Sequence, residues 1–136
     1  MKTVPIEQLS GVGPVLGARF REHGIADTKS LLLECRTPEN RSRLAGLVAI
    51  SADHLLKLAN RADLMRITTI GTQHAELLES AGVDTVRELN RRSAVSLHKL
   101  LVSLNNEKRL CRRVPSARKI LTWIEKSEAL PVMLHY

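Results

Sequence analysis

Aromatic side chains are nearly absent from this chain of 136 residues. Phe20, Trp123 and Tyr136 are the whole aromatic set, so no aromatic platform for stacking single-stranded bases can be assembled. Apolar residues still make up 43% of the chain, which is enough for a core of Leu, Ile, Val and Ala. The sequence therefore predicts a compact aliphatic domain and not a disordered segment.

Long apolar runs and metal-ligand spacings are also missing. No stretch approaches the roughly 20 apolar residues of a membrane span, and the N-terminus lacks the apolar run of a signal peptide, so we expect a cytoplasmic protein without membrane contact. Cys35 and Cys111 have no motif spacing and the five histidines are scattered, so we expect buried thiols and no metal. The absence of a nucleophile elbow, a P-loop and a dinucleotide fingerprint predicts a non-catalytic protein without a cofactor or an evident small-molecule substrate.

Positive charge is present in excess and is concentrated in one part of the chain. The chain has 21 Lys and Arg against 14 Asp and Glu, for a net charge of +7. Ten of the basic residues and only two of the acidic ones lie between Arg87 and Lys119, so this window carries the whole surplus. Such a field favours a polyanionic partner, with nucleic acid first, although a basic face that only keeps the protein soluble would have the same composition.

Two segments of the chain resemble each other at a spacing of 58 residues. The segment beginning Leu9-Ser10-Gly11-Val12-Gly13 matches the one beginning Ile67-Thr68-Thr69-Ile70-Gly71, and Gly24 then matches Gly82. After one extra residue in the first copy, Asp27-Thr28 matches Asp84-Thr85, and both pairs have the residue types of helix N-caps. Each copy predicts a tight turn between two helices, and the second of these helices ends at a left-handed glycine.

Apolar residues recur at helical spacing through most of the chain, and no strand-like alternation of useful length is present. The sequence therefore predicts an all-α fold, a single compact helical domain over residues 1–136 with two pseudo-symmetric repeats. The predicted parts are repeat one at about 6–36, linking helices at about 38–62, repeat two at about 63–92, and C-terminal basic helices at about 93–130.

The repeated turn resembles the helix-hairpin-helix motif. The first copy, Leu9-x-Gly11-Val12-Gly13-x-x-x-Gly17, has its Gly-hydrophobic-Gly turn and its small residue for close helix packing, and the second copy, Ile67-x-Thr69-Ile70-Gly71-x-x-x-Ala75, is a degraded version. The whole chain from about Ile6 to Pro131 resembles the bacterial family called domain of unknown function 4332, a resemblance based on Gly11-Val12-Gly13, Asn60 with Asp63-Leu64, Gly82-Val83, Arg112-Arg113 and Trp123-Ile124. This resemblance implies a fold of tandem helix-hairpin-helix motifs and implies little about function.

The physics of such a turn favours an anion. The turn ends at a helix N-terminus, where unpaired amides and the positive end of the helix dipole attract phosphate. We therefore expect the first turn (Gly11, Val12 and Gly13) and, less strongly, the second (Thr69, Ile70 and Gly71) to contact phosphates of duplex DNA. Two departures weaken this expectation: Pro14 removes one N–H, and Thr69 replaces a glycine and should make positive φ less accessible.

Basic residues near the C-terminus would add electrostatic attraction to the same ligand. Four of them, Lys108, Arg109, Arg112 and Arg113, are spaced so that several would share one helical face, with Leu110 and Cys111 or Val114 pointing inward. The candidate residues are Lys108, Arg109, Arg112, Arg113, Arg118 and Lys119.

Several alternatives remain open from the sequence alone. Arg112 or Arg113 could form a buried pair with Asp63 or Glu107 that holds the repeats together. Arg91 and Arg92 could serve only the dipole at a helix end. Glu76 and Glu79 share a helix face and have the spacing of solvated surface carboxylates. The hairpins could also be purely structural, in a protein interaction scaffold with an acidic protein partner.

Overall fold

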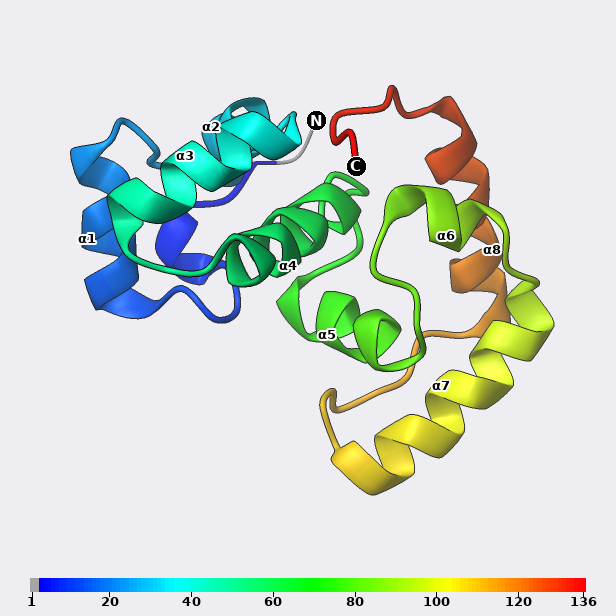
Figure 1. The fold of residues 1–136 in the computed structure, drawn as a ribbon. Helices are drawn as coiled ribbons and strands as arrows, with labels where there is room; N and C mark the ends of the chain where they lie inside the picture. Colours follow the sequence, from blue (N-terminus) through cyan, green and yellow to red (C-terminus); the bar gives the residue numbers. More distant parts are fainter. Residues whose placement is uncertain (1–2) are drawn as a thin grey trace.

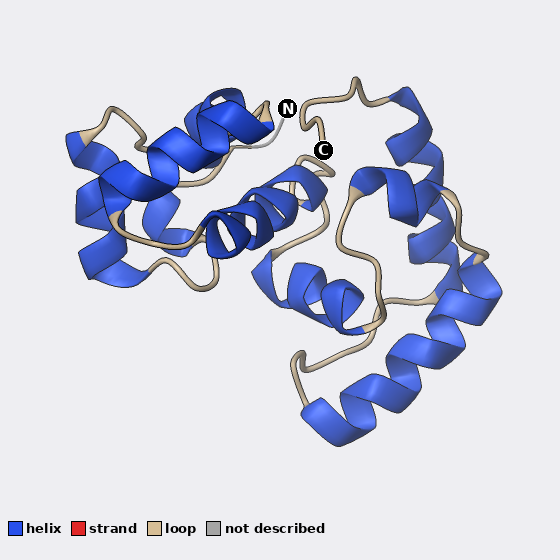
Figure 2. Cartoon of the chain, viewed as in Figure 1, coloured by secondary structure: helices blue, strands red, loops and turns tan. Residues whose placement is uncertain are grey.

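The structure is a computed structural model that describes residues 3–136. Within these residues a short 3₁₀ helix and eight α-helices make up the fold, and no strand is present (Figures 1 and 2). The predicted all-α fold is therefore confirmed. In chain order the elements are η1 (Ile6–Gln8), α1 (Gly13–Glu22), α2 (Thr28–Glu34), α3 (Pro38–Val48), α4 (Ala52–Leu64), α5 (Thr72–Ser80), α6 (Val86–Asn90), α7 (Ala94–Lys108) and α8 (Ala117–Ala129).

Side-chain caps determine where most of the helices begin. In five helices the N-cap oxygen accepts a hydrogen bond from the backbone amide three residues later, which satisfies one of the unpaired N–H groups of the first turn. The predicted pair Asp84-Thr85 supplies one of these caps through Thr85: Glu88 N is 2.9 Å from Thr85 Oγ1, and Asp84 lies outside the helix. The five caps are Asp27, Thr37, Ser51, Thr85 and Ser116.

The same backbone hydrogen bonds recur 58 residues apart. Gly24 and Gly82 end their helices at φ +81° and +82°, and the amide that follows each one donates at 2.9 Å to the carbonyl of Phe20 or Leu78. Since the caps Asp27 and Thr85 are also 58 residues apart, the predicted extra residue in the first copy is wrong. Ahead of these helices, the donor–acceptor pairs Gln8–Pro5, Leu9–Ile6 and Val12–Leu9 correspond to Arg66–Asp63, Ile67–Leu64 and Ile70–Ile67.

One hydrophobic core joins two groups of helices. In Figure 1, α1, α2 and α3 lie on one side and α6, α7 and α8 on the other, with α4 and α5 between them. Helix α4 packs against α2, α3 and α5, and α5 packs in turn against α7. Phe20 in the first group and Trp123 in the second are both fully buried, and the rest of the core is aliphatic as predicted.

The C-terminal tail connects the two groups a second time, which the sequence did not predict. Residues 131–136 return from α8 to the first group, where the His135 amide donates to the Arg36 carbonyl at 2.8 Å. The Tyr136 hydroxyl donates to Asn60 Oδ1 on α4 at 2.5 Å, and the Arg41 guanidinium lies 5.7 Å from the Tyr136 ring centroid. The tail therefore adds polar and cation–π contacts across the domain.

A buried ion pair lies under this tail. Arg66 Nε and Asp63 Oδ1 are 2.8 Å apart, and the side chains are only 2% and 7% exposed. Burial raises the pKa of the Asp63 carboxyl, and the neighbouring Arg66 opposes this shift. Arg66 Nη1 also donates to the Pro131 carbonyl at 2.8 Å, so one guanidinium holds both the end of α4 and the start of the tail.

We expect Arg66→Met to lower the free energy of unfolding by about 3–5 kcal/mol at pH 7, because Asp63 is then left charged and buried without its partner. Urea denaturation measures the loss. The loss should shrink near pH 4, because the pKa of Asp63 is raised in the folded state and its protonated form needs no partner.

The double variant Asp63→Asn/Arg66→Met is the matched control, since it removes both charges from the same site. It should recover most of the lost stability at pH 7. A double variant as unstable as Arg66→Met would show that the stability comes from the arginine's other contacts and not from pairing with Asp63.

Candidate nucleic-acid interface

The first turn, which precedes α1, is built on two glycines in the left-handed region. Gly11 has φ +90° and Gly13 has φ +68°, in agreement with the predicted Gly-hydrophobic-Gly turn. A Cβ on Gly11 would lie 2.9 Å from Arg61 Nη1, so this glycine also permits close approach to α4. Val12 is buried and its amide donates to the Leu9 carbonyl at 3.1 Å, so it anchors the turn, while Gly11 and Gly13 are exposed.

The second turn, which precedes α5, reaches its helix without any positive φ. Gly71 has φ −90° and serves as the N-cap without a side-chain hydrogen bond. Ile70 is fully buried and its amide donates to the Ile67 carbonyl at 2.9 Å, as the Val12 amide does in the first turn. Thr69 is exposed, and its Oγ1 accepts a hydrogen bond from Trp123 Nε1 at 2.7 Å, which leaves its hydroxyl proton available for donation.

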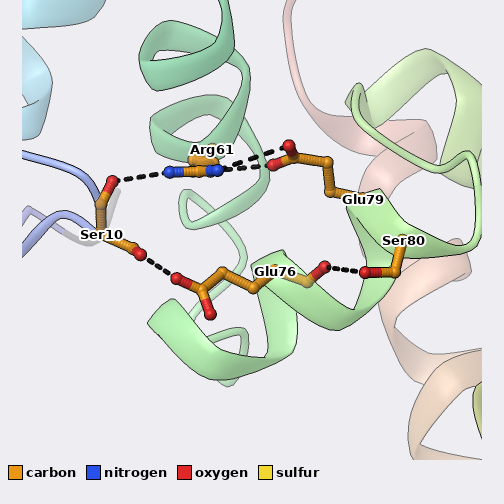
Figure 3. Close-up of polar contacts among 5 residues, drawn as sticks. All are labelled: Ser10, Arg61, Glu76, Glu79 and Ser80. Carbon is orange, nitrogen blue, oxygen red and sulfur yellow. Dashed lines mark hydrogen bonds and ion pairs between the residues drawn. The ribbon is translucent and has the colours of Figure 1, made fainter. Parts of the chain in front are cut away.

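Four side chains bond the first turn to α5 (Figure 3). We call this group, made up of Ser10, Arg61, Glu76 and Glu79, the Arg61 joint. Arg61 on α4 donates from Nη1 to the Ser10 carbonyl at 2.8 Å, and from Nε and Nη2 to the Glu79 carboxylate at 2.8 and 3.3 Å. The Ser10 hydroxyl also donates to the Glu76 carboxylate. Glu76 and Glu79 are thus engaged between elements, contrary to their interpretation as solvated surface.

A further hydrogen bond places the two turns side by side. The Thr72 hydroxyl, in the first residue of α5, donates to the Gln8 carbonyl at 3.1 Å. This bond fixes the start of α5 against the segment that leads into the first turn, and the Arg61 joint holds the same helix further along, at Glu76 and Glu79. The two turns therefore lie together on one side of the molecule.

Residues 109–116 form a loop, which we call the basic loop. Arg109 ends α7 at φ +50°, and its amide donates to the Asn105 carbonyl at 2.9 Å. The Asn105 side chain then holds Cys111 at both ends: its Nδ2 donates to the Cys111 carbonyl at 2.9 Å, and its Oδ1 accepts from the Cys111 amide at 3.0 Å. The predicted helical face containing Lys108, Arg109, Arg112 and Arg113 is therefore wrong, because the left-handed residue and this clamp end the helix at Lys108.

The basic loop and the start of α5 enclose a shallow polar depression. Gln73, in the first turn of α5, lines one side of it, and Arg109 and Arg112 line the other. No acidic side chain lines it. The structure thus brings two of the six candidate basic residues to the helix that follows the second turn.

The other four candidate basic residues, Lys108, Arg113, Arg118 and Lys119, are exposed but lie outside the depression. Arg118 and Lys119 are in the first turn of α8, where the helix dipole disfavours cations. Trp123 fixes α8 to the second turn through Thr69, and its ring lies 5.4 Å from that of His74. This contact connects α8 to the second turn.

The alternatives for other charged residues are resolved. Arg112 and Arg113 are both exposed, and Asp63 pairs with Arg66, so the suggested buried pair is wrong. Arg92 donates to Glu88 at 3.3 Å and to the Ala81 carbonyl at 3.3 Å, which makes it a local structural contact. Arg61 joins the first turn to α5, as Arg66 joins the end of α4 to the tail.

Sequence reasoning missed Arg61, Asn105 and Gln73. Arg61 and Asn105 act through hydrogen bonds to segments that the sequence alone does not place beside them. A weak signal existed for Asn105, because asparagine near the end of a helix often bonds to backbone groups of the following turn. Gln73 had a positional signal only, since it follows the second turn directly.

Comparison with known proteins supplies the family. Residues 10–130 match the family described as domain of unknown function, DUF4332. The chain belongs to this family. The chain matches no curated protein and no solved structure. The description of DUF4332 states no activity.

Two further properties of this DUF4332 chain are the state of its thiols and the character of its helices. Cys35 and Cys111 are buried free thiols, as predicted, and burial raises the pKa of Cys35 to about 12. Among residues 3–136, no helix combines the length and the apolar character needed to cross a bilayer.

We expect Arg109→Gly to raise the free energy of unfolding by about 0.5–1 kcal/mol, because glycine tolerates the left-handed conformation that strains arginine. Ala49→Gly is the matched control, since Ala49 ends α3 at φ +62° in the same conformation and lies outside the depression. Urea denaturation of both variants measures the effect. A loss of stability in Arg109→Gly alone would mean that the arginine side chain stabilises the fold.

Proposed function

We propose that this protein is a non-catalytic module that binds duplex nucleic acid, DNA in particular, with low sequence specificity. In this proposal, residues 6–36 and 63–92 are two helix-hairpin-helix units related by pseudo-symmetry. The main support is the shared position of α5: the Arg61 joint bonds the first turn to this helix, and Arg109 and Arg112 line a depression at its start.

The backbone groups that would meet phosphate are at the starts of α1 and α5. Neither helix has a side-chain N-cap hydrogen bond, so the positive end of each dipole, with the Thr72 and Gln73 amides in α5, can be offered to an anion. Pro14 contributes no N–H in α1, which makes α5 the better donor. Gly11, Gly13, Thr69 and Gly71 would allow close approach, while Val12 and Ile70 hold the turns to the core.

The basic residues would supply long-range attraction without reading sequence. All six candidates are exposed, and their guanidinium and ammonium groups can neutralise phosphates on either strand. Contacts of this kind release condensed counterions, so affinity should fall steeply as salt rises. Low specificity follows because no side chain in the proposal contacts a base edge.

We expect duplex DNA to bind with a log–log salt dependence of about −0.9 per neutralised phosphate. Titrating a fluorescent duplex of mixed sequence at two or more salt concentrations gives this slope. A second duplex of unrelated sequence should give the same slope and a similar affinity. Absence of binding at low salt would overturn the proposal and favour an interaction scaffold with an acidic protein partner.

We also expect Arg112→Gln/Arg113→Gln to weaken duplex binding several-fold on every sequence and to reduce the salt slope by roughly two phosphates. The matched control is Lys29→Gln/Arg43→Gln, which removes the same charge from exposed positions on α2 and α3. This control should change affinity much less. Equal losses in the two double variants would show that net charge alone determines binding.

A further inference from the structure

We propose that the depression between α5 and the basic loop is a discrete binding site for one phosphate group. The inference rests on the proposed function, because the first ligand that it names is a phosphodiester of the bound nucleic acid. A free phosphate or a terminal phosphate monoester offers the same chemistry, and the experiment below distinguishes these sources.

The lining has the composition of an oxyanion site. Arg109 and Arg112 supply two guanidinium groups, and Gln73 and Asn106 add neutral amide donors. Within residues 3–136, no ion pair or side-chain hydrogen bond engages either guanidinium, so both remain available for a ligand. The depression encloses about 460 Å³ and opens to solvent, which leaves room for a phosphate that is still part of a chain.

The backbone of the site is fixed before any ligand arrives. Two hydrogen bonds join Asn105 to Cys111. Arg109 lies between these two residues and Arg112 follows them directly, so the bonds restrain the backbone at both arginines. On the opposite side, Gln73 belongs to a helix held by Arg61, Ser10 and Gln8. Both sides are thus held by hydrogen bonds within the protein, which limits the ordering entropy lost on binding.

The left-handed backbone conformation of Arg109 is an independent observation that bears on the site. Glycine or asparagine is the usual residue in a left-handed helix C-cap, and arginine there is strained. Since no ion pair or side-chain hydrogen bond among residues 3–136 engages its guanidinium, a ligand of opposite charge gives the arginine a role that the fold does not.

The test uses the whole chain and inorganic phosphate, with chloride at matched ionic strength as the reference. NMR follows the Gln73 amide and the arginine Nε–H signals during the titration. We expect saturable shifts of Gln73, Arg109 and Arg112, and affinity reduced roughly tenfold or more in Arg112→Gln, the loss of one charge-assisted hydrogen bond. Arg91→Gln is the matched control, because Arg91 is exposed and lies outside the depression, and it should bind phosphate as the unmodified chain does.

Each outcome bears on the proposal. Linear, unsaturable shifts shared by all exposed arginines would overturn the discrete site even if duplex DNA binds, and the proposed function would then stand alone. Saturable phosphate binding without any duplex binding would support the site and overturn the proposed function.

A third arm identifies the source of the phosphate. It compares duplexes with and without a 5′-phosphate on the unmodified chain and on Arg112→Gln. A preference for the phosphorylated end that disappears in Arg112→Gln would identify a terminal phosphate, and equal binding that weakens in the variant would identify an internal phosphodiester. Duplex binding that is indifferent to both the end group and the variant would exclude nucleic acid as the source and leave free phosphate.

Discussion

The relative position of the two turns depends on the Arg61 guanidinium. It bonds to the first turn, through the Ser10 carbonyl, and to the helix behind the second turn, through Glu79. The Arg61 and Glu79 side chains are only 20% and 28% exposed, so the pair is less screened by solvent than an ordinary surface ion pair. Gly11 takes part in the same arrangement, because a side chain there would collide with Arg61. Arg61 therefore holds the first turn and the helix that follows the second turn against each other.

Local features were predictable from the sequence because each depends on neighbours along the chain. The left-handed glycines Gly11, Gly13, Gly24 and Gly82 and the cap Ser51 follow from residue type and short spacing. The cap of α6 was predicted only as the pair Asp84-Thr85, because aspartate and threonine are both good N-caps, and Thr85 is the one that caps the helix. The helix predicted through Arg113 failed because its periodicity gave no sign of the Asn105 clamp.

Other features that the sequence did not predict depend on distant segments. Arg61 reaches Ser10 across 51 positions, and Tyr136 reaches Asn60 across 76. Nothing in the composition or spacing of the chain assigns those partners. The candidate site was therefore half predictable: its glycines and basic residues were identified, while the residues that bring them together were not. The basic residues of this surface also lower the stability of the fold in two places. Arg109 is strained in the left-handed conformation, and the helix dipole disfavours the cations at the start of α8.

The measurement that tests this account most directly is an amide chemical-shift map of the whole chain upon addition of a short DNA duplex at low salt. The account predicts that the perturbed residues cluster on Gly13, Thr72, Gln73 and the basic loop, which come from three separate parts of the sequence and are brought together by the Arg61 joint, the Thr72–Gln8 hydrogen bond and the depression. Perturbations confined to α2 and α3, or to residues 131–136 of the tail, would contradict it.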